Sequence, residues 1–421
     1  MKLAVIGLGH VGLPLSSLLA IHSKVVGYDL DSNKIQLVKN GSIPVREPDL
    51  DTYLKEALLS GNLRVTSDAS EILETDVKII TVGTPYDKKI DYIDYSQLEA
   101  SLDIIIPNLK KGDVVMLKST VPPGTTTGPV MKRMEAAGFK VPEDIGLVFS
   151  PERMIEGQAI KDFQSLPKII GSTDDRSFAV ARDILSGLGG KIIRVSNPET
   201  AETIKMVDNY SRYVFLGLVN ELALACEKIG IDVLEVIRAA KDEYPRNAGL
   251  LIPGPGVGGS CLNKDPFILR GVLRNSGMEM GMVRSAEEIN TKMPHHVADL
   301  VCEYRGSGTV TILGVAFKGE TDDTRSTPSF QIRDVLVKKG FSVRMTDPYV
   351  TGKEITNDLY AACTSSSIIV LVTDHEEYKR INLCKLRNLM SDSPLIIDTR
   401  GIIDRYSAIK NGFEYHGLGR L

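Results

Sequence analysis

The sequence predicts an α/β protein in which two Rossmann-like, doubly wound domains are joined by a central helical domain with a long helix. Short Val- and Ile-rich strands alternate with amphipathic stretches in the first part of the chain. The middle part has helical periodicity only, and the last part returns to alternation. Alternating strands and helices indicate parallel sheets with helices on both faces. We expect domains at residues 1–200, 201–300 and 305–421.

The strands of the first domain are expected to be short, apolar and buried. Amphipathic helices are expected at 13–20 and 49–59, between runs that are rich in Val and Ile. The strand candidates are 2–6, 24–29, 77–82, 114–118 and 146–150.

The middle domain is expected to contain one long helix over 201–229, because apolar residues recur there at three- and four-residue steps. A helix of this length either spans domains or packs against a partner subunit. We expect a homodimer, with a linker helix inside one chain as the alternative. The strands expected in the third domain are 309–313, 342–345, 368–372 and 395–397.

Composition excludes several classes of protein. The 421 residues are 43% hydrophobic and 25% charged with a net charge of −4, so no bulk basicity favours nucleic-acid binding. The five cysteines are widely spaced, which fits neither a disulfide framework nor a zinc site, and the six histidines lack ligand spacing. We therefore expect reduced thiols and no metal. Without a signal-peptide pattern or an apolar run of about 18 residues, we expect a cytoplasmic protein with no membrane contact.

A GxGxxG motif directly after the first strand predicts an NAD site. Gly7 permits the tight turn, Gly9 lets the backbone approach a pyrophosphate, and Gly12 allows close packing of helix on strand. Asp29 ends the second strand, where a carboxylate holds ribose hydroxyls and repels a 2′-phosphate. The alternative is a glycine turn without a ligand. We also place His10, as a spacer rather than a catalyst, and Val11, Thr84 and Thr120 at the cofactor.

The loop around Cys261 predicts a reactive thiol. Glycines precede it, so a ligand can approach the backbone, and Lys264 and Asp265 follow within four residues. A nearby cation favours the thiolate, and an acidic neighbour can accept a proton from water. The alternative is an ordinary buried cysteine in a turn. That alternative is our interpretation for the other cysteines, Cys226, Cys302, Cys363 and Cys384.

An ordered set of motifs resembles the UDP-glucose/GDP-mannose dehydrogenase family nearly from end to end. The resemblance implies NAD-dependent, four-electron oxidation of the C6 hydroxyl of a UDP-sugar to a carboxylate. It also implies that Cys261 traps the aldehyde as a thiohemiacetal, which is then oxidised to a thioester. The motifs are Gly7–Gly12, Lys118–Thr125, Ser150–Arg153, Glu156-Gly157, Ala201–Lys205 with Asn209, Gly258–Asp265 and Phe317–Ser326.

The resemblance implies roles for individual residues. Lys205 and Asn209, four apart on one helix face, would stabilise an alkoxide or oxyanion. Asp265 would assist deprotonation of Cys261 or activate water. Thr120 and Glu152 would hold a water near C6, with Glu152 as a general acid/base. Substrate contacts would also come from Arg153, Gly258, Lys318 and Arg325, and Arg246 would complete a neighbouring subunit's site.

The sugar is the least determined part of the prediction. Ser-Pro-Glu-Arg at 150–153 stands where UDP-glucose enzymes usually have Asn-Pro-Glu-Phe, and the Arg form looks like the branch acting on UDP-N-acetylhexosamines. Arg153 adds a planar donor that suits a different C2 substituent. We favour UDP-N-acetylmannosamine over UDP-glucose or UDP-N-acetylglucosamine. Two other classes stay open: a two-electron dehydrogenase of the 3-hydroxyacid type and a non-catalytic NAD-binding scaffold.

Overall fold

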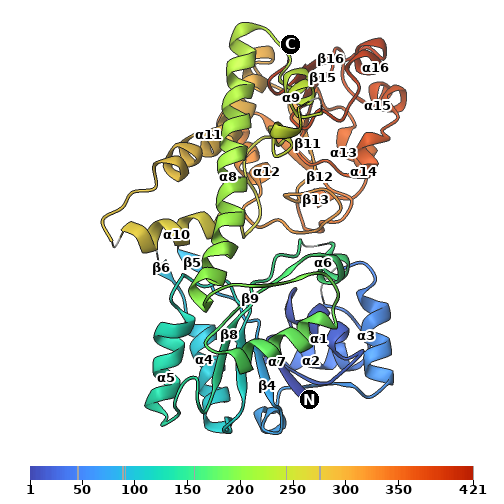
Figure 1. Cartoon of the computed structure of the whole chain (residues 1–421). Helices are drawn as coiled ribbons and strands as arrows, with labels where there is room; N and C mark the ends of the chain where they lie inside the picture. Colours follow the sequence, from blue (N-terminus) through green and yellow to red (C-terminus); the bar gives the residue numbers. More distant parts are fainter. Residues whose placement is uncertain are drawn as a thin grey trace. The chain divides into compact units, whose positions relative to one another are not determined.

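A computed structural model describes residues 1–44, 47–87, 90, 92–155, 157–242, 244–274 and 276–420 of the chain. These residues form two compact units. The first unit contains Met1–Asp208 and Phe267–Met278, and the second contains Asn209–Pro266 and Glu279–Leu421. The long helix α8 (Pro198–Ile229) begins in the first unit and continues in the second (Figure 1). The predicted division into three domains stays a prediction.

The first unit is built on a sheet with the order β10-β9-β8-β7-β4-β1-β2-β3. The predicted strands are confirmed within one or two residues at their ends. The short strands β3, β9 and β10 were not predicted, and β9 pairs with β8 in the antiparallel direction, which departs from the expected all-parallel sheet. The strands are β1 (Lys2–Ile6), β2 (Lys24–Tyr28), β3 (Leu63–Thr66), β4 (Val77–Ile80), β7 (Val114–Leu117), β8 (Gly146–Phe149), β9 (Lys168–Ser172) and β10 (Ile192–Arg194), beside a hairpin of β5 (Tyr86–Asp87) and β6 (Tyr92–Ile93).

Two apolar cores cover the two faces of this sheet. Leu3 and Val5 of β1 belong to one core, and Ala4 and Ile6 to the other, because successive side chains of a strand point to opposite faces. Both faces are therefore buried, as expected for a doubly wound sheet. The helices of this unit are α1 (Gly12–Leu19), α2 (Ser32–Lys39), α3 (Leu50–Leu59), α4 (Ser96–Ile105), α5 (Met131–Ala136), α6 (Ala159–Ser165) and α7 (Asp175–Ser186).

The second unit contains an entirely parallel sheet with the order β13-β12-β11-β14-β15-β16. The four predicted strands are confirmed, and the short strands β13 and β16 were not predicted. Counted along the sheet, this is the 3-2-1-4-5-6 order of a Rossmann fold. The strands are β11 (Thr309–Leu313), β12 (Ser342–Thr346), β13 (Ile355–Thr356), β14 (Ile368–Leu371), β15 (Leu395–Asp398) and β16 (Glu414–Gly417), with helices α12 (Pro328–Lys338), α13 (Leu359–Cys363), α14 (Glu376–Lys379), α15 (Leu383–Leu389) and α16 (Arg405–Lys410).

Within the second unit, α8 packs closely against a second long helix, α11 (Gly281–Tyr304). A Cβ on Gly217 would lie 2.8 Å from the Ala286 Cβ, so only glycine fits at this contact. Beside it, the buried Asn220 Nδ2 donates to Asn290 Oδ1 at 2.9 Å, which satisfies polar groups inside the contact. The remaining helices of the middle part are α9 (Val233–Asp242) and α10 (Asp265–Arg274).

Candidate active site

The glycine motif forms the turn that the sequence predicts. Gly7 has φ +94°, and its N–H donates to the Tyr28 carbonyl at 2.8 Å, which ties the end of β1 to β2. A Cβ on Gly12 would lie 1.8 Å from the Gly7 oxygen, whereas a Cβ on Gly9 would meet nothing within 4 Å. The turn is thus closed where helix meets strand and open where a pyrophosphate would approach.

The Asp29 carboxylate fixes this turn from the end of β2. Its Oδ2 accepts from the Leu8 N–H and from Lys34 Nζ, both at 2.8 Å, and its Oδ1 accepts from the Asp31 N–H at 3.0 Å. Burial acts to raise the pKa of Asp29, but these hydrogen bonds outweigh it and hold the pKa below its usual value. Lys34 was missed by the sequence reasoning, although it lies in the first turn of α2, soon after the end of β2.

A cavity of about 410 Å³ lies beside this turn and is lined within the first unit. The fit to NAD is good on three counts: the backbone is open at Gly9, a carboxylate stands at Asp29, and apolar side chains such as Val82 form a wall for a base. The residues that would hold the adenosine half of NAD include Gly7, Gly9, Asp29, Lys34, Val82 and Gly83.

The other residues that we expected at the cofactor lie elsewhere in the same loops. His10 is exposed and Val11 is half-buried, and neither lines the 410 Å³ cavity. The buried Thr84 hydroxyl donates to the Thr120 carbonyl at 2.5 Å. Thr84 therefore ties the loop after β4 to the loop after β7, and its contact with NAD stays a prediction.

Thr120 and Glu152 follow neighbouring parallel strands, β7 and β8, so both lie at the carboxyl edge of the sheet where ligands bind in such folds. Glu152 Oε1 accepts from the N–H groups of Arg153 at 2.8 Å and Met154 at 3.0 Å. Its Oε2 lies 3.3 Å from Nζ of Lys118, which is almost fully buried. The ion pair and the backbone fix the carboxylate, and Lys118 is a site residue that our role assignments omitted.

Helix α8 carries Lys205, which is buried with 9% of its surface exposed. Asp208 lies three residues later on the same helix and forms an ion pair with Arg153, whose Nε is 3.3 Å from Asp208 Oδ2. The Arg153 side chain, expected to contact substrate, is thus oriented by a carboxylate that the sequence did not indicate.

In the second unit, the structure brings Asn209 and Asp265 together. Asn209 Nδ2 donates to Asp265 Oδ2 at 2.5 Å, and Asp265 is fully buried at the start of α10. The Cys261 carbonyl accepts from the N–H groups of Lys264 at 3.1 Å and Asp265 at 2.9 Å. A tight turn therefore connects the cysteine to the Asn209–Asp265 pair.

Cys261 is exposed, and its Sγ lies 3.8 Å from the Ser260 hydroxyl. Exposure distinguishes it from the buried cysteines, one of which, Cys363, has its thiol pKa raised by burial to about 12. Cys384 is also exposed, on helix α15, and Cys302 is half-buried, so the expectation of a buried cysteine is wrong for Cys384 and holds fully only for Cys226 and Cys363.

The glycines before Cys261 let their loop pack on the motif Phe317–Ser326. A Cβ on Gly258 would lie 2.4 Å from the Phe317 Cβ, and Gly259 has φ +82°. The Gly259 N–H donates to the Arg325 carbonyl at 2.8 Å. The Arg325 guanidinium is held by Asp323, with Nη2 2.6 Å from Oδ2. Arg325 is therefore attached to the cysteine loop by its backbone and has a fixed side chain.

Two further residues, Lys318 and Arg246, are expected to contact the substrate. Lys318 is half-buried in the loop after β11, beside Phe317. Arg246 is exposed in a short helical turn, Pro245–Asn247, and no hydrogen bond or ion pair joins it to the cysteine loop in the described part of the chain. Glu156 of the quoted motifs lies outside the described residues.

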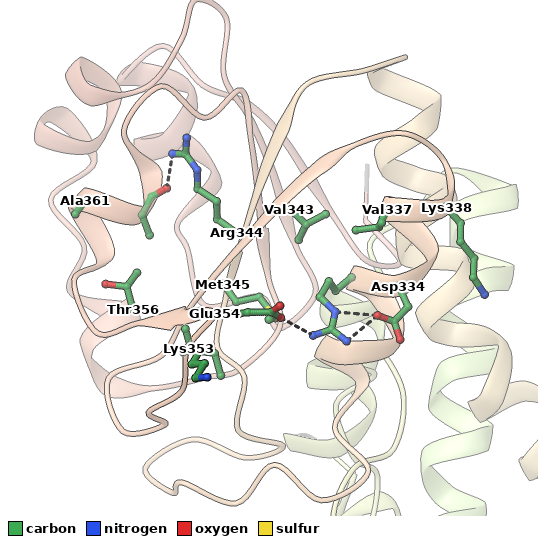
Figure 2. A pocket seen from close by; sticks show the side chains of 13 residues that line it. Asp334, Val337, Lys338, Val343, Arg344, Met345, Lys353, Glu354, Thr356 and Ala361 are labelled. Carbon is green, nitrogen blue, oxygen red and sulfur yellow. Dashed lines mark hydrogen bonds and ion pairs between the residues drawn. The ribbon is translucent and has the colours of Figure 1, made fainter.

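A groove of about 970 Å³ in the second unit contains none of the predicted site residues. It lies along β12 and α12, and Figure 2 shows ion pairs at two of its charged side chains, Asp334 and Glu354. Arg333 contacts Asp334 and Glu354, and Arg344 Nη1 donates to the Ala362 carbonyl at 3.2 Å. The groove is therefore not part of the site that the sequence predicts.

Family models match three successive parts of the chain. They are the NAD binding domain at residues 1–188, the central domain at 199–292 and the UDP binding domain at 311–405. The chain belongs to the UDP-glucose/GDP-mannose dehydrogenase family. It is an NAD-dependent UDP-sugar dehydrogenase, and this assignment sets aside the 3-hydroxyacid and scaffold alternatives.

Similar proteins match the chain over nearly its whole length. UDP-N-acetyl-D-mannosamine dehydrogenase of Methanocaldococcus jannaschii is 34% identical and covers 99% of this chain and 96% of its own. The UDP-glucose 6-dehydrogenase TuaD of Bacillus subtilis is 32% identical and covers 100% of this chain and 93% of its own. The solved UDP-D-ManNAc dehydrogenase of Pyrococcus horikoshii has a TM-score of 0.92 at 34% identity, covering 100% of this chain and 99% of its own. In the described part of this chain, no helix is both long and apolar enough to cross a membrane.

Proposed function

We propose that the enzyme oxidises UDP-N-acetylmannosamine at C6 to UDP-N-acetylmannosaminuronate through a covalent bond to Cys261. The observation that carries the proposal is the exposed Cys261, held in one tight turn with the buried Asn209–Asp265 pair. The names of relatives at 34% identity and the Arg153 side chain support the choice of sugar.

The reaction consumes the alcohol, one water and two NAD, and yields the carboxylate, two NADH and three protons. NAD supplies the chemistry of hydride acceptance at both oxidations. Cys261 acts between them: its thiolate forms a C–S bond to the aldehyde carbon, and the second oxidation leaves a thioester at the same sulfur. Attack of water breaks the C–S bond, releases the acid and returns the thiol.

The chain's polar residues would stabilise charge and move protons in these steps. The Asn209 amide has two N–H groups, so one can bind Asp265 while the other donates to the substrate oxygen. Lys205 supplies a buried cation for the alkoxide or oxyanion. Asp265 would receive the thiol proton or activate water. Thr120 would hold the water that Glu152, fixed beside Lys118, deprotonates.

The test compares Cys261→Ser with Cys384→Ser, which changes the other exposed cysteine that lies outside the motifs. Purified enzyme should form two NADH per UDP-sugar and a uronate. Cys384→Ser should do the same, whereas Cys261→Ser should lose acid production by a factor of at least about 1,000, as loss of a nucleophile does. One NADH per turnover, or an active Cys261→Ser enzyme, would contradict the cysteine mechanism.

The sugar is tested separately with UDP-N-acetylmannosamine, UDP-N-acetylglucosamine and UDP-glucose. The first should give the highest kcat/KM, and Arg153→Phe should reduce that preference because it removes the planar donor. Turnover with UDP-glucose alone would refute the choice of sugar and leave the reaction class intact.

The proposed homodimer rests on an apolar stripe along α8. Val207, Phe215 and Leu218 share one helix face and are each at least 40% exposed. Burying this stripe against a second copy would remove it from water. Light scattering should give twice the mass of the chain, and Phe215→Glu with Leu218→Glu should give the monomer mass. A monomeric wild-type enzyme would refute this part of the proposal.

A further inference from the structure

Glu202 is a fully buried carboxylate on the first turns of α8, within the first unit, and the proposed reaction makes no use of it. Its Oε2 accepts from the Gly124 N–H at 2.5 Å. Its Oε1 accepts from the Thr126 N–H at 2.9 Å and from the Thr126 hydroxyl at 2.6 Å. Three donors from one turn of the chain therefore converge on one side chain.

That turn belongs to the loop that carries Thr120. At the start of the loop, the Ser119 hydroxyl donates to the Val82 carbonyl at 2.6 Å, and Thr84 binds the Thr120 carbonyl. At its end, Thr126 begins a π-helical turn, Thr126–Val130. Such turns frequently mark functional sites. Glu202 holds the far end of the loop, while Thr84 and Ser119 hold the near end.

The same side chain stands one helical turn before Lys205. Residues three apart lie on adjoining parts of one helix face, so a shift of the Glu202 contact is a shift of the loop relative to Lys205. Glu202 thus joins the segment that carries Thr120 to the helix that carries Lys205.

The geometry requires a carboxylate rather than an amide. Gly124 and Thr126 each present a backbone N–H, one to each carboxylate oxygen. A glutamine has a single acceptor oxygen, so its NH₂ would face one of the two N–H groups, and an unpaired buried N–H is costly.

Keeping this charge buried opposes folding. Desolvation raises the pKa of Glu202 to about 7 against its three hydrogen bonds, and the nearby Glu199 adds to the rise. Buried charges that do not stabilise a fold are often found at functional sites.

We propose that Glu202 is a positioning residue of the oxidation, which sets Thr120 relative to Lys205 by binding the Gly124–Thr126 turn. The proposal rests on the roles proposed for Thr120 and Lys205. It assigns Glu202 no contact with substrate or cofactor.

The variant that tests it is Glu202→Gln, with Glu199→Gln as the matched control. Glu199 lies one turn earlier, and in the described part of the chain its carboxylate accepts the Thr127 hydroxyl, which one amide oxygen can still accept. We expect Glu202→Gln to lower kcat roughly 10- to 100-fold, as small misplacements of reacting groups do. The KM for NAD should change less than twofold, because the Gly7–Asp29 cavity is not involved. Glu199→Gln should keep both constants.

A second readout is hydrogen exchange of the Gly124 and Thr126 amides in the full-length enzyme. Glu202→Gln should speed exchange at one or both amides at least about tenfold, while the β7 amides stay protected. Thr126→Val should reproduce part of the loss in kcat, and Thr126→Ser should restore it because the hydroxyl returns.

Faster exchange at 124–126 with unchanged kcat would overturn the positioning role. Equal loss of kcat in Glu199→Gln and Glu202→Gln, with a lowered melting temperature in both, would also overturn it. If the exchange result holds but the wild-type enzyme oxidises no UDP-sugar, the proposed function fails while the Glu202 contact stands.

Discussion

The two Rossmann-like sheets build the same turn twice, but only one turn is left open. Gly7 and Gly314 follow the first strand of each sheet with φ +94° and +93°. Each donates its N–H at 2.8 Å to the end of the neighbouring strand, at Tyr28 and at Thr346. The backbone conformation is the same, because in both sheets the chain leaves the first strand at the point where the strand order reverses.

The two turns differ in the residues after the glycine and in the surroundings of the strand-end aspartate. Gly9 is replaced in the second turn by Ala316, which is fully buried. Asp29 accepts one N–H from its turn and lies beside the 410 Å³ cavity, whereas Asp347 accepts the N–H groups of Val315 and Ala316 and is fully buried.

The second turn is closed by the protein's own side chains. The buried His375 ring places Nε2 3.1 Å from Asp347 Oδ2, and Tyr378 packs edge-on against His375. Burial acts to raise the pKa of Asp347, but the bonds from His375, Ala316 and Val315 hold it at about 2. The strand-end aspartate thus lines an open cavity in the first sheet, where we propose that it binds NAD, and is enclosed by the protein's own side chains in the second.

The largest effect that separates the two turns is expected from Gly314→Ala. Its Cβ would lie 2.3 Å from the Thr373 Cβ in a left-handed conformation, so unfolding free energy should fall by about 3 kcal/mol or more. The Cβ added by Gly9→Ala would meet no atom within 4 Å, so this variant should have nearly the same free energy of unfolding as the wild type. Its affinity for NAD should fall at least about tenfold, because the backbone there is where the pyrophosphate approaches. Urea unfolding measures the stability of the two variants, and calorimetric titration measures their affinity for NAD. Equal destabilisation by Gly314→Ala and Gly9→Ala would contradict the difference between the two turns.

Asp347→Asn comes next, with an expected loss of about 2–3 kcal/mol, because buried N–H groups and His375 lose a charged acceptor. The folded pKa of about 2 lies below the ordinary 3.8, so this stabilisation is present above pH 3.8 and is lost as pH falls towards 2. Melting temperature measured against pH should show that acid step in the wild type and not in Asp347→Asn. Weaker NAD binding by the folded variant would argue against a purely structural Asp347.

Asp29→Asn should act mainly on the cofactor. We expect NAD affinity to fall about tenfold, since a hydrogen bond to a charged acceptor contributes about 1.5–3 kcal/mol. Affinity for NADP should fall less, because the repulsion of the 2′-phosphate disappears. Titration with both nucleotides measures the ratio of the NAD and NADP affinities. An unchanged ratio would show that Asp29 does not determine the choice of cofactor.

The smallest effect is expected from Lys34→Met. The Lys34–Asp29 pair is partly exposed and contributes about 0.5–1 kcal/mol, so NAD binding should weaken about two- to fivefold. Discrimination against NADP should increase, because the Asp29 charge is no longer compensated. A rise in the NADP affinity of Lys34→Met would contradict the proposal that Lys34 compensates the charge of Asp29.

Local patterns predicted most of the strands and the motifs from which the site is proposed. Apolar runs of four or five residues identified β1, β2, β4, β7 and β8, because strands buried on both faces are continuous apolar runs. The strands β3 and β10 were not predicted, because Leu63–Thr66 and Ile192–Arg194 are short and each contains an arginine at an exposed position. A run of apolar residues does not indicate the direction in which its strand pairs, so the antiparallel β8–β9 pair could not be predicted from the sequence.

The site residues divide in the same way. Cys261, Lys205 and Asp29 stand in motifs that sequence alone displays. Lys34 and Lys118 were missed because their importance comes from a carboxylate that only the folded chain brings within 3.3 Å.

The sequence by itself determined the glycines at Gly7 and Gly12, the family, and the NAD and UDP-sugar chemistry. The glycines follow from local requirements, a positive φ at Gly7 and the absence of a Cβ at Gly12, whereas the family and its chemistry follow from the order of the motifs along the chain. The tertiary structure alone decided which carboxylates bind which donors. Glu202 reaches Gly124 across 78 residues and Asp265 reaches Asn209 across 56, and such distant pairs form only because packed helices and strands place them. The same packing left one glycine turn open for a cofactor and filled the other with His375.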